Sequence, residues 1–172
     1  EGPTGVVGVV VDGDSALEGT LVTEKPQAGK IASAGTYMMT INMMDYTYKI
    51  TPLAPEYYLV GDNFAWDVNT KKHIMYAESV TVHSYTGRFD GNLKFINGND
   101  MGTDNWGATY GTPQDGDTSV SGTLQQNAGA IHSPEAGYYT FTADISSMTY
   151  TWTRLENQNP DSYTTIGLVG EF

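Results

Sequence analysis

The chain contains no cysteine, few basic residues and no long apolar run. Without cysteine, neither disulfide bonds nor thiol chemistry can contribute. No apolar stretch approaches the roughly 20 residues that a transmembrane helix needs, so none is predicted here. Only 8 Lys and Arg stand against 20 Asp and Glu, which gives a net charge of −12. A phosphate backbone requires clustered positive charge, and the composition therefore excludes a nucleic-acid partner.

A sustained helical period is also missing, whereas glycine (20 residues) and tyrosine (12 residues) are abundant, as in short strands joined by tight turns. Apolar and polar residues alternate in 138–145 and 148–153, which predicts strands with one buried face. These faces are expected to be Tyr139, Phe141, Ala143 and Ile145 in the first segment, and Met148, Tyr150 and Trp152 in the second. Further strands are expected at 57–61, 74–76, 79–85, 92–96 and 120–124. The pattern predicts an all-β fold of two-sheet, immunoglobulin-like sandwiches.

The sequence also repeats, with a module length of about 105 residues. The matching segments are 13–21 and 116–124, offset by 103 residues; 34–48 and 136–150, offset by 102; and 58–61 and 167–170, offset by 109. Their order predicts a tandem array with an incomplete first and last module. We expect the C-terminal half of a β-sandwich module in 1–53, a complete module in 54–156, and a linker with the first strand of a following module in 157–172.

The repeat separates core tryptophans from candidate site tryptophans. Trp152 takes the place of Ile50 in the other copy, so an aliphatic side chain suffices there and a structural role is expected. Trp66 and Trp106 lie instead in polar, glycine-rich segments, and Trp106 corresponds to Pro3, so the sandwich does not require an aromatic residue at that position. An exposed indole often marks a binding patch. The alternatives are that Trp66 covers the end of the sandwich and that Trp106 anchors its loop.

The surroundings of these two tryptophans favour carbohydrate binding in the module of residues 54–156. A planar aromatic ring matches the apolar face of a pyranose, and polar neighbours supply directional hydrogen bonds to its hydroxyl groups. The polar and aromatic candidates around them are Asn63, Asp67, Asn69, Lys71, Lys72, Lys94, Asn97, Asn99, Asp104, Asn105 and Tyr110.

Catalysis and cofactors find little support in the sequence. Most carboxylates lie in turns such as Asp12-Gly13-Asp14, where backbone bonding explains them, and do not suggest the acid and base of a glycosidase. The three histidines lack zinc-site spacing. We therefore expect no enzyme, no cofactor and no catalytic or resident metal site. For the oxygen-rich loop 97–104, a solvated turn is favoured and a calcium site remains the alternative, since the loop lacks EF-hand spacing.

Several segments in order resemble modules of the SusE/SusF type, which are surface glycan-binding lipoproteins of Bacteroidetes polysaccharide utilisation systems. The segments are the Tyr-Tyr-Leu-Val-Gly-Asp opening at 57–62 with Trp66 nearby, Gly-Asn-Leu-Lys-Phe at 91–95, Asp-Asn-Trp-Gly at 104–107, and the closing strands at 136–145 and 148–152. The resemblance implies non-catalytic binding of starch or a related α-glucan at the outer membrane, with a lipid anchor in the full-length protein. The implied glycan-binding residues are Trp66, Trp106, Lys94, Asn105 and Tyr110.

A second class of function, a structural or adhesive spacer without a glycan site, stays open at this point. Exposed strand edges seek partners. We expect the strand at 166–172 to pair with the first half-module of the same chain or with a neighbouring chain, as strand-edge pairing or domain swapping. Polysaccharide or oligosaccharide is the principal expected partner, and the resemblance adds other outer-membrane glycan-uptake proteins.

Overall fold

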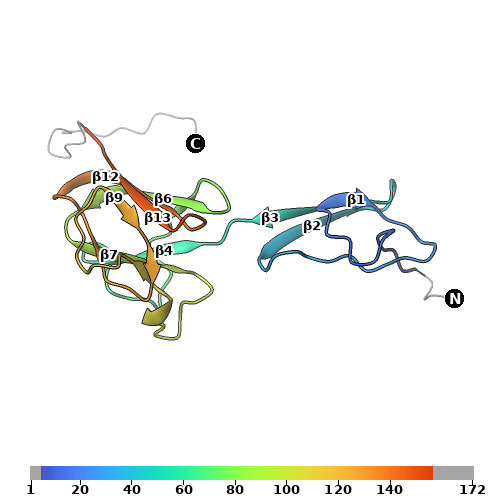
Figure 1. The fold of residues 1–172 in the computed structure, drawn as a ribbon, viewed down its shortest axis with the longest axis horizontal. Helices are drawn as coiled ribbons and strands as arrows, with labels where there is room; N and C mark the ends of the chain where they lie inside the picture. Colours follow the sequence, from blue (N-terminus) through green and yellow to red (C-terminus); the bar gives the residue numbers. More distant parts are fainter. Residues whose placement is uncertain (1–4, 157–172) are drawn as a thin grey trace, which may run out of the picture. The chain divides into compact units, whose positions relative to one another are not determined.

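The structure, a computed structural model, describes residues 5–156 of the chain (Figure 1). It divides into two compact units between Pro55 and Glu56. Within residues 5–156 there is no α-helix, and one short 3-10 helix accompanies the strands. The prediction of an all-β fold is therefore confirmed. No helix in this part of the chain is long and apolar enough to cross a membrane.

The first unit holds one antiparallel sheet of three strands. They are β1 (Glu18–Thr20), β2 (Thr36–Asn42) and β3 (Thr47–Leu53), in the order β1-β3-β2. Val9, Tyr48 and Ile50 form its small core. Side chains alternate along a strand, so Tyr37, Met39 and Ile41 share one face of β2, but Met39 and Ile41 are exposed. Among residues 5–156, this face of β2 is therefore only partly covered.

The second unit is a two-sheet sandwich, as predicted. One sheet has the order β5-β6-β12-β13-β9, and in the other β7 pairs with β4, β8 and β11, with β10 beside β8. The bounds are β4 Tyr57–Gly61, β5 Tyr76–Ala77, β6 Val82–Phe89, β7 Asn92–Asn97, β8 Tyr110–Gly111, β9 Ser121–Thr123, β10 Gln125–Gln126, β11 Ile131–His132, β12 Gly137–Asp144 and β13 Thr149–Arg154.

The core of the second unit lies between these sheets and contains the predicted inward-facing residues. Phe141 is fully buried, and Trp152 packs against it with ring centroids 4.8 Å apart. Trp152 is 6% exposed, so its structural role is confirmed. The predicted bounds of the strands are less accurate than the predicted faces. For example, the strand expected at 74–76 is observed at Tyr76–Ala77, and Ile74 forms only an isolated bridge with Tyr58.

Matching strands of the two units are built alike. The order β1-β3-β2 in the first unit corresponds to β9-β13-β12 in the second. Tyr48 donates its hydroxyl to the carbonyl of Ala16, as Tyr150 does to that of Ser119. In the second unit the far edge of β12 pairs with β6 over eight residues, whereas within residues 5–156 β2 pairs only with β3. The strand expected at 166–172 lies outside the described residues.

Candidate functional site

Strand β4 is buried on both faces, which identifies where the loops of the second unit pack. Its residues Tyr57 and Leu59 belong to the core between the sheets. Tyr58 and Val60 point to the opposite face and join a second cluster with Val68, Ile96 and Ala108. Val68 lies in the loop that follows β4, and Ala108 ends the loop that follows β7. Both loops therefore pack on the outer face of the β4–β7 pair, and these loops carry Trp66 and Trp106.

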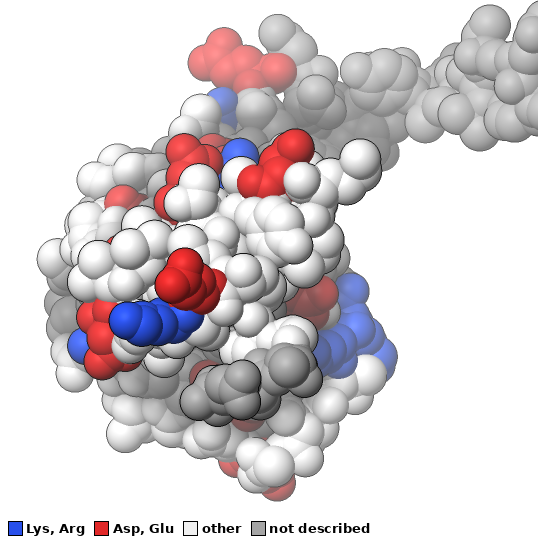
Figure 2. Space-filling view, turned by 90° about the vertical axis from the view of Figure 1, so that its right-hand side faces the viewer, with Lys and Arg blue, Asp and Glu red and all other residues white. Residues whose placement is uncertain are grey.

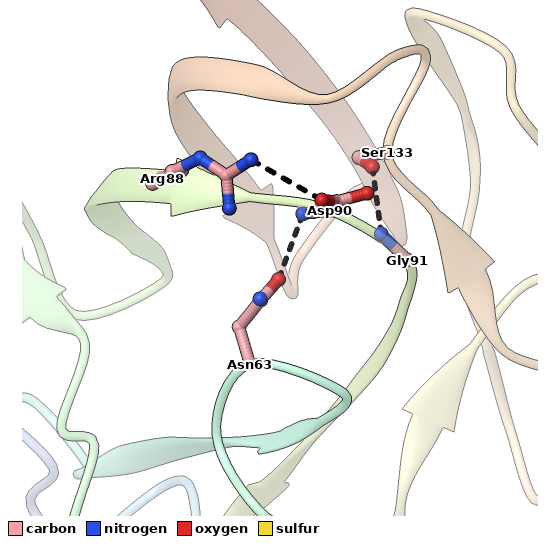
Figure 3. Close-up of polar contacts among 5 residues, drawn as sticks. All are labelled: Asn63, Arg88, Asp90, Gly91 and Ser133. Carbon is pink, nitrogen blue, oxygen red and sulfur yellow. Dashed lines mark hydrogen bonds and ion pairs between the residues drawn. The ribbon is translucent and has the colours of Figure 1, made fainter.

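The base of the first loop is fixed to the turn between β6 and β7. The Asp62 carboxylate accepts a hydrogen bond from the Asn92 backbone N–H (2.7 Å) and another from the Trp66 indole N–H (2.8 Å). Asn63 Oδ1 accepts the backbone N–H of Asp90 at 2.7 Å (Figure 3). The same figure shows Arg88 paired with Asp90 in this turn. Two successive polar side chains thus hold the start of the loop and orient the indole of Trp66.

A glycine is required in this turn. Gly91 has a φ of +119°, which side chains other than glycine rarely adopt. A Cβ on Gly91 would also lie 2.4 Å from Asp62 Oδ2. The turn can therefore approach the Asp62 carboxylate closely only because residue 91 has no side chain.

The second loop presents Trp106 at the start of the 3-10 helix η1 (Trp106–Ala108). Asp104 has a φ of +55°, and its carbonyl accepts the N–H of Trp106 at 2.9 Å. The carbonyl of Trp106 in turn accepts both the N–H and the hydroxyl of Thr109. Asn105 immediately precedes the helix, and its carbonyl accepts the N–H of Ala108. These local bonds place the indole of Trp106 at the surface while Ala108 is buried beneath it.

The two indoles lie side by side. Their ring centroids are 6.2 Å apart and their planes are inclined by 43°. Trp66 is 43% exposed and Trp106 is 37% exposed. The expectation that both rings lie open to solvent and close together therefore agrees with the structure. They form an inclined, partly exposed aromatic pair contributed by two loops that are far apart in the sequence.

The loops are also joined directly. Asn69 donates from Nδ2 to Asp104 Oδ1 (3.0 Å), and the backbone N–H of Asp104 donates to Asn69 Oδ1 (2.8 Å). The N–H of Gly102 donates to the carbonyl of Val68. Sequence reasoning treated Asn69 and Asp104 only as polar neighbours that could contact a ligand. Their mutual pairing was not foreseeable, because no sequence signal links residues 35 positions apart in two irregular loops.

The remaining candidates are Lys94 and Tyr110, which lie on opposite faces of the sheet that contains β7, and Asn105 in the second loop. Lys94 lies opposite Val60 across the β4–β7 pair, on the face that the two loops cover, and is partly exposed. Within residues 5–156 it forms no ion pair, whereas Lys71, Arg88 and Arg154 each pair with a carboxylate. Asn105 adjoins Trp106.

Tyr110 differs from the other candidates. Its ring stacks on Phe95 with centroids 5.1 Å apart. Phe95 belongs to the core between the sheets. Successive strand residues point to opposite faces, so Tyr110 lies on the other side of the sheet from Lys94.

Hydrogen bonds in the first loop stabilise the charged form of two carboxylates, Asp62 and Asp67. The Asn92 N–H and then the Trp66 indole lower the pKa of Asp62. The side chain of Thr70 and the N–H of Asn69 lower the pKa of Asp67. Figure 2 draws the face seen from the right-hand side of Figure 1, on which acidic and basic side chains are scattered among uncharged residues.

The loop 97–104 uses its oxygen atoms for its own turns. Asn97 Oδ1 accepts the N–H of Asn99, and its carbonyl accepts that of Asp100. The Asp104 carboxylate is engaged by Asn69. In the described part of the chain, no three His, Asp or Glu side chains gather where they could hold a metal ion. Several oxygen atoms of the loop are thus engaged in hydrogen bonds within the protein.

Comparisons with known proteins agree with this description. A family model described as "SusF, first starch specific CBM", where CBM denotes a carbohydrate-binding module, matches residues 2–52 and, separately, 53–154. The crystal structure of SusF from Bacteroides thetaiotaomicron is similar, with a TM-score of 0.51 and 20% sequence identity. The similarity covers 68% of this chain and 31% of that one, so this chain corresponds to less than a third of SusF. At this identity the likeness concerns the fold. No curated protein matches the chain.

Proposed function

Because the chain belongs to the family of SusF first starch-specific carbohydrate-binding modules, we propose that its second unit binds starch or a related α-glucan through Trp66 and Trp106. Membership of a family of binding modules places the chain among carbohydrate-binding proteins and not among enzymes. The observation that carries the proposal is the pair of exposed indoles with centroids 6.2 Å apart.

The angle between the indoles supports an α-glucan in particular. Two rings inclined by 43° fit sugar rings that turn relative to each other along a curved chain, as α-linked glucose units do. Large rigid aromatic side chains also lose little conformational entropy when they bind, which suits a shallow exposed site.

Lys94 and Asn105 complete the proposed surface by donating hydrogen bonds to sugar hydroxyl groups. Lys94 lies on the face that carries the loops and has no acidic partner among residues 5–156. Asn105 stands next to Trp106, and within the described residues its side chain forms no capping hydrogen bond. Tyr110 is left out of the surface, because its ring stacks on Phe95 toward the core.

The setting of this site in a longer protein is proposed from the resemblance. We infer that 1–53 is the C-terminal half of one module, 54–156 a complete module and 157–172 the start of another. The separate family matches to 2–52 and 53–154 support the first two assignments. The protein would act at the outer-membrane surface, held by a lipid anchor and beside other glycan-uptake proteins. Several modules on one chain would raise a weak single-site affinity by avidity.

Affinity electrophoresis in native gels containing soluble starch tests the function. We expect starch to retard the wild-type chain, and Trp66→Ala or Trp106→Ala to lower the affinity roughly tenfold or more, as for central aromatic contacts elsewhere. Tyr76→Ala is the matched control, since Tyr76 is a still more exposed aromatic residue on a strand of the other sheet. Equal retardation of all four proteins, or retardation of none, would contradict the proposal.

A further inference from the structure

We propose that Asn69 and Asp104 form a clasp that fixes the two indoles relative to each other before a glycan binds. They are positioning residues, since they act through Trp66 and Trp106 and need not touch the sugar. The inference rests on the proposed glycan binding, for which the separation and angle of the two rings matter.

The clasp consists of two reciprocal hydrogen bonds. Asn69 Nδ2 donates to the Asp104 carboxylate, and Asn69 Oδ1 accepts the Asp104 backbone N–H. Only one orientation of the amide satisfies both bonds, because its nitrogen donates and its oxygen accepts. The pair therefore fixes the side-chain conformations of both residues as well as the distance between their loops.

Each end of the clasp is connected to one tryptophan by a short path. On the first loop, the N–H of Asn69 donates to the carboxylate of Asp67, the residue that follows Trp66. On the second loop, the carbonyl of Asp104 accepts the N–H of Trp106. A shift of one loop relative to the other would therefore change the position of one indole against its partner.

Packing alone leaves this relation incompletely determined. Val68 and Ala108 attach the two loops to the outer face of β4 and β7, and Gly102 N–H bonds to the carbonyl of Val68. These contacts set the height of the loops above the sheet. The clasp joins the loops through side chains close to both indoles. Asp104 lies two residues before Trp106, and Asn69 lies three residues after Trp66.

A fixed pair of rings binds more tightly than a mobile pair, because the ordering cost on binding is smaller. Both clasp hydrogen bonds are exposed to solvent, so their loss is expected to affect the unfolding temperature little. The clasp thus has an effect on binding that can be separated from an effect on stability.

The test exchanges the two side chains. Asn69→Asp removes the donor and brings two carboxylates together, so the clasp opens. Adding Asp104→Asn in the same chain restores both hydrogen bonds. The side-chain bond is reversed, because the amide now at position 104 donates to the carboxylate at position 69, while the backbone N–H of residue 104 still donates to the side chain at position 69. Asn also tolerates the positive φ at position 104. Asn127→Asp is the matched control, because it makes the same charge change at an exposed position outside the two loops, where the positive φ also tolerates Asp.

Two measurements on the full chain separate the clasp from the function. The circular-dichroism couplet of two adjacent indoles reports their relative position without glycan, and Trp66→Phe identifies its contribution. Starch retardation reports binding. We expect Asn69→Asp to weaken the couplet and lower affinity roughly tenfold, the double variant to recover both, and Asn127→Asp to change neither.

Three results are decisive. An unchanged couplet and affinity in Asn69→Asp would overturn the inference. Losses that the double variant does not recover would overturn it as well, since the pair would then not act by mutual hydrogen bonding. A couplet that is lost and recovered as expected, in a chain that starch never retards, would support the clasp as the element that positions the indoles and would contradict the proposed function instead.

Discussion

The Asp62 carboxylate is the acceptor that orients the Trp66 indole, and it also binds the N–H of Asn92. These hydrogen bonds lower its pKa, so they stabilise the loop above the ordinary aspartate pKa of about 3.9 and are lost as the pH falls through the lower folded-state value. Because Asp62 stays ionised there, we predict a glycan affinity that changes little with pH between about pH 5 and 8 and declines only below about pH 4. Affinity electrophoresis at a series of pH values measures this.

Asp62→Asn provides the accompanying mutational test. An amide has one acceptor oxygen and cannot serve both N–H groups as the carboxylate does, so we expect an affinity several-fold lower at neutral pH and a smaller decline in acid. Asp90→Asn is the control. It changes an exposed carboxylate in the neighbouring turn that pairs with Arg88 and does not bind the indole. If both variants behaved alike, the effect would be one of general surface charge and the role given to Asp62 would be wrong.

At the scale of the strand, Trp152 supports the sheet from which the site is built. Its indole packs against Phe89, Tyr139 and Phe141. Trp152→Ala removes these contacts and leaves a cavity, so we expect the free energy of unfolding of the second unit to fall by about 3–5 kcal/mol. Thr151→Ala, on the exposed face of the same strand, should change it by less than about 0.5 kcal/mol. Urea unfolding followed by circular dichroism tests the pair, and similar losses in both would contradict the packing.

Strands were predictable from the sequence because their signal is local. The alternation in 138–145 and 148–153 identified the buried faces of β12 and β13, since side chains on a strand alternate with a period of two. Trp106 was identified because the repeat places Pro3 at the corresponding position, so the fold does not need an aromatic residue there. Trp66 was identified because it lies in a polar, glycine-rich segment just after a predicted strand. The packing of both loops on the outer face of β4 could not be predicted from such a local pattern. It depends on contacts such as Val68 with Ala108, which join irregular segments about 40 residues apart.

At the scale of the whole chain, the two units differ in how fully their equivalent sheets are covered. In the second unit, β12 has β6 along its far edge and a second sheet over its apolar face. In the first unit, β2 pairs only with β3 among residues 5–156, and its sequence contains no charged residue or proline. A hollow of about 260 Å³ lies among residues that include Val9, Ile31 and Met39. Natural edge strands are usually protected by charge, proline or a covering segment. We therefore propose that this edge and face associate with another strand, as in edge pairing between chains.

Two neighbouring methionines allow a direct test of this association. Met39 points to the apolar face and Met38 to the opposite face of β2, and both are similarly exposed, at 57% and 52%. We predict that the chain self-associates at high concentration, that Met39→Lys raises the dissociation constant at least roughly tenfold, and that Met38→Lys leaves it nearly unchanged. Sedimentation analysis over a range of concentrations measures all three. A wild-type chain that stays monomeric, or two variants with equal effects, would contradict the proposal, because only a face-specific contact can distinguish adjacent residues of one strand.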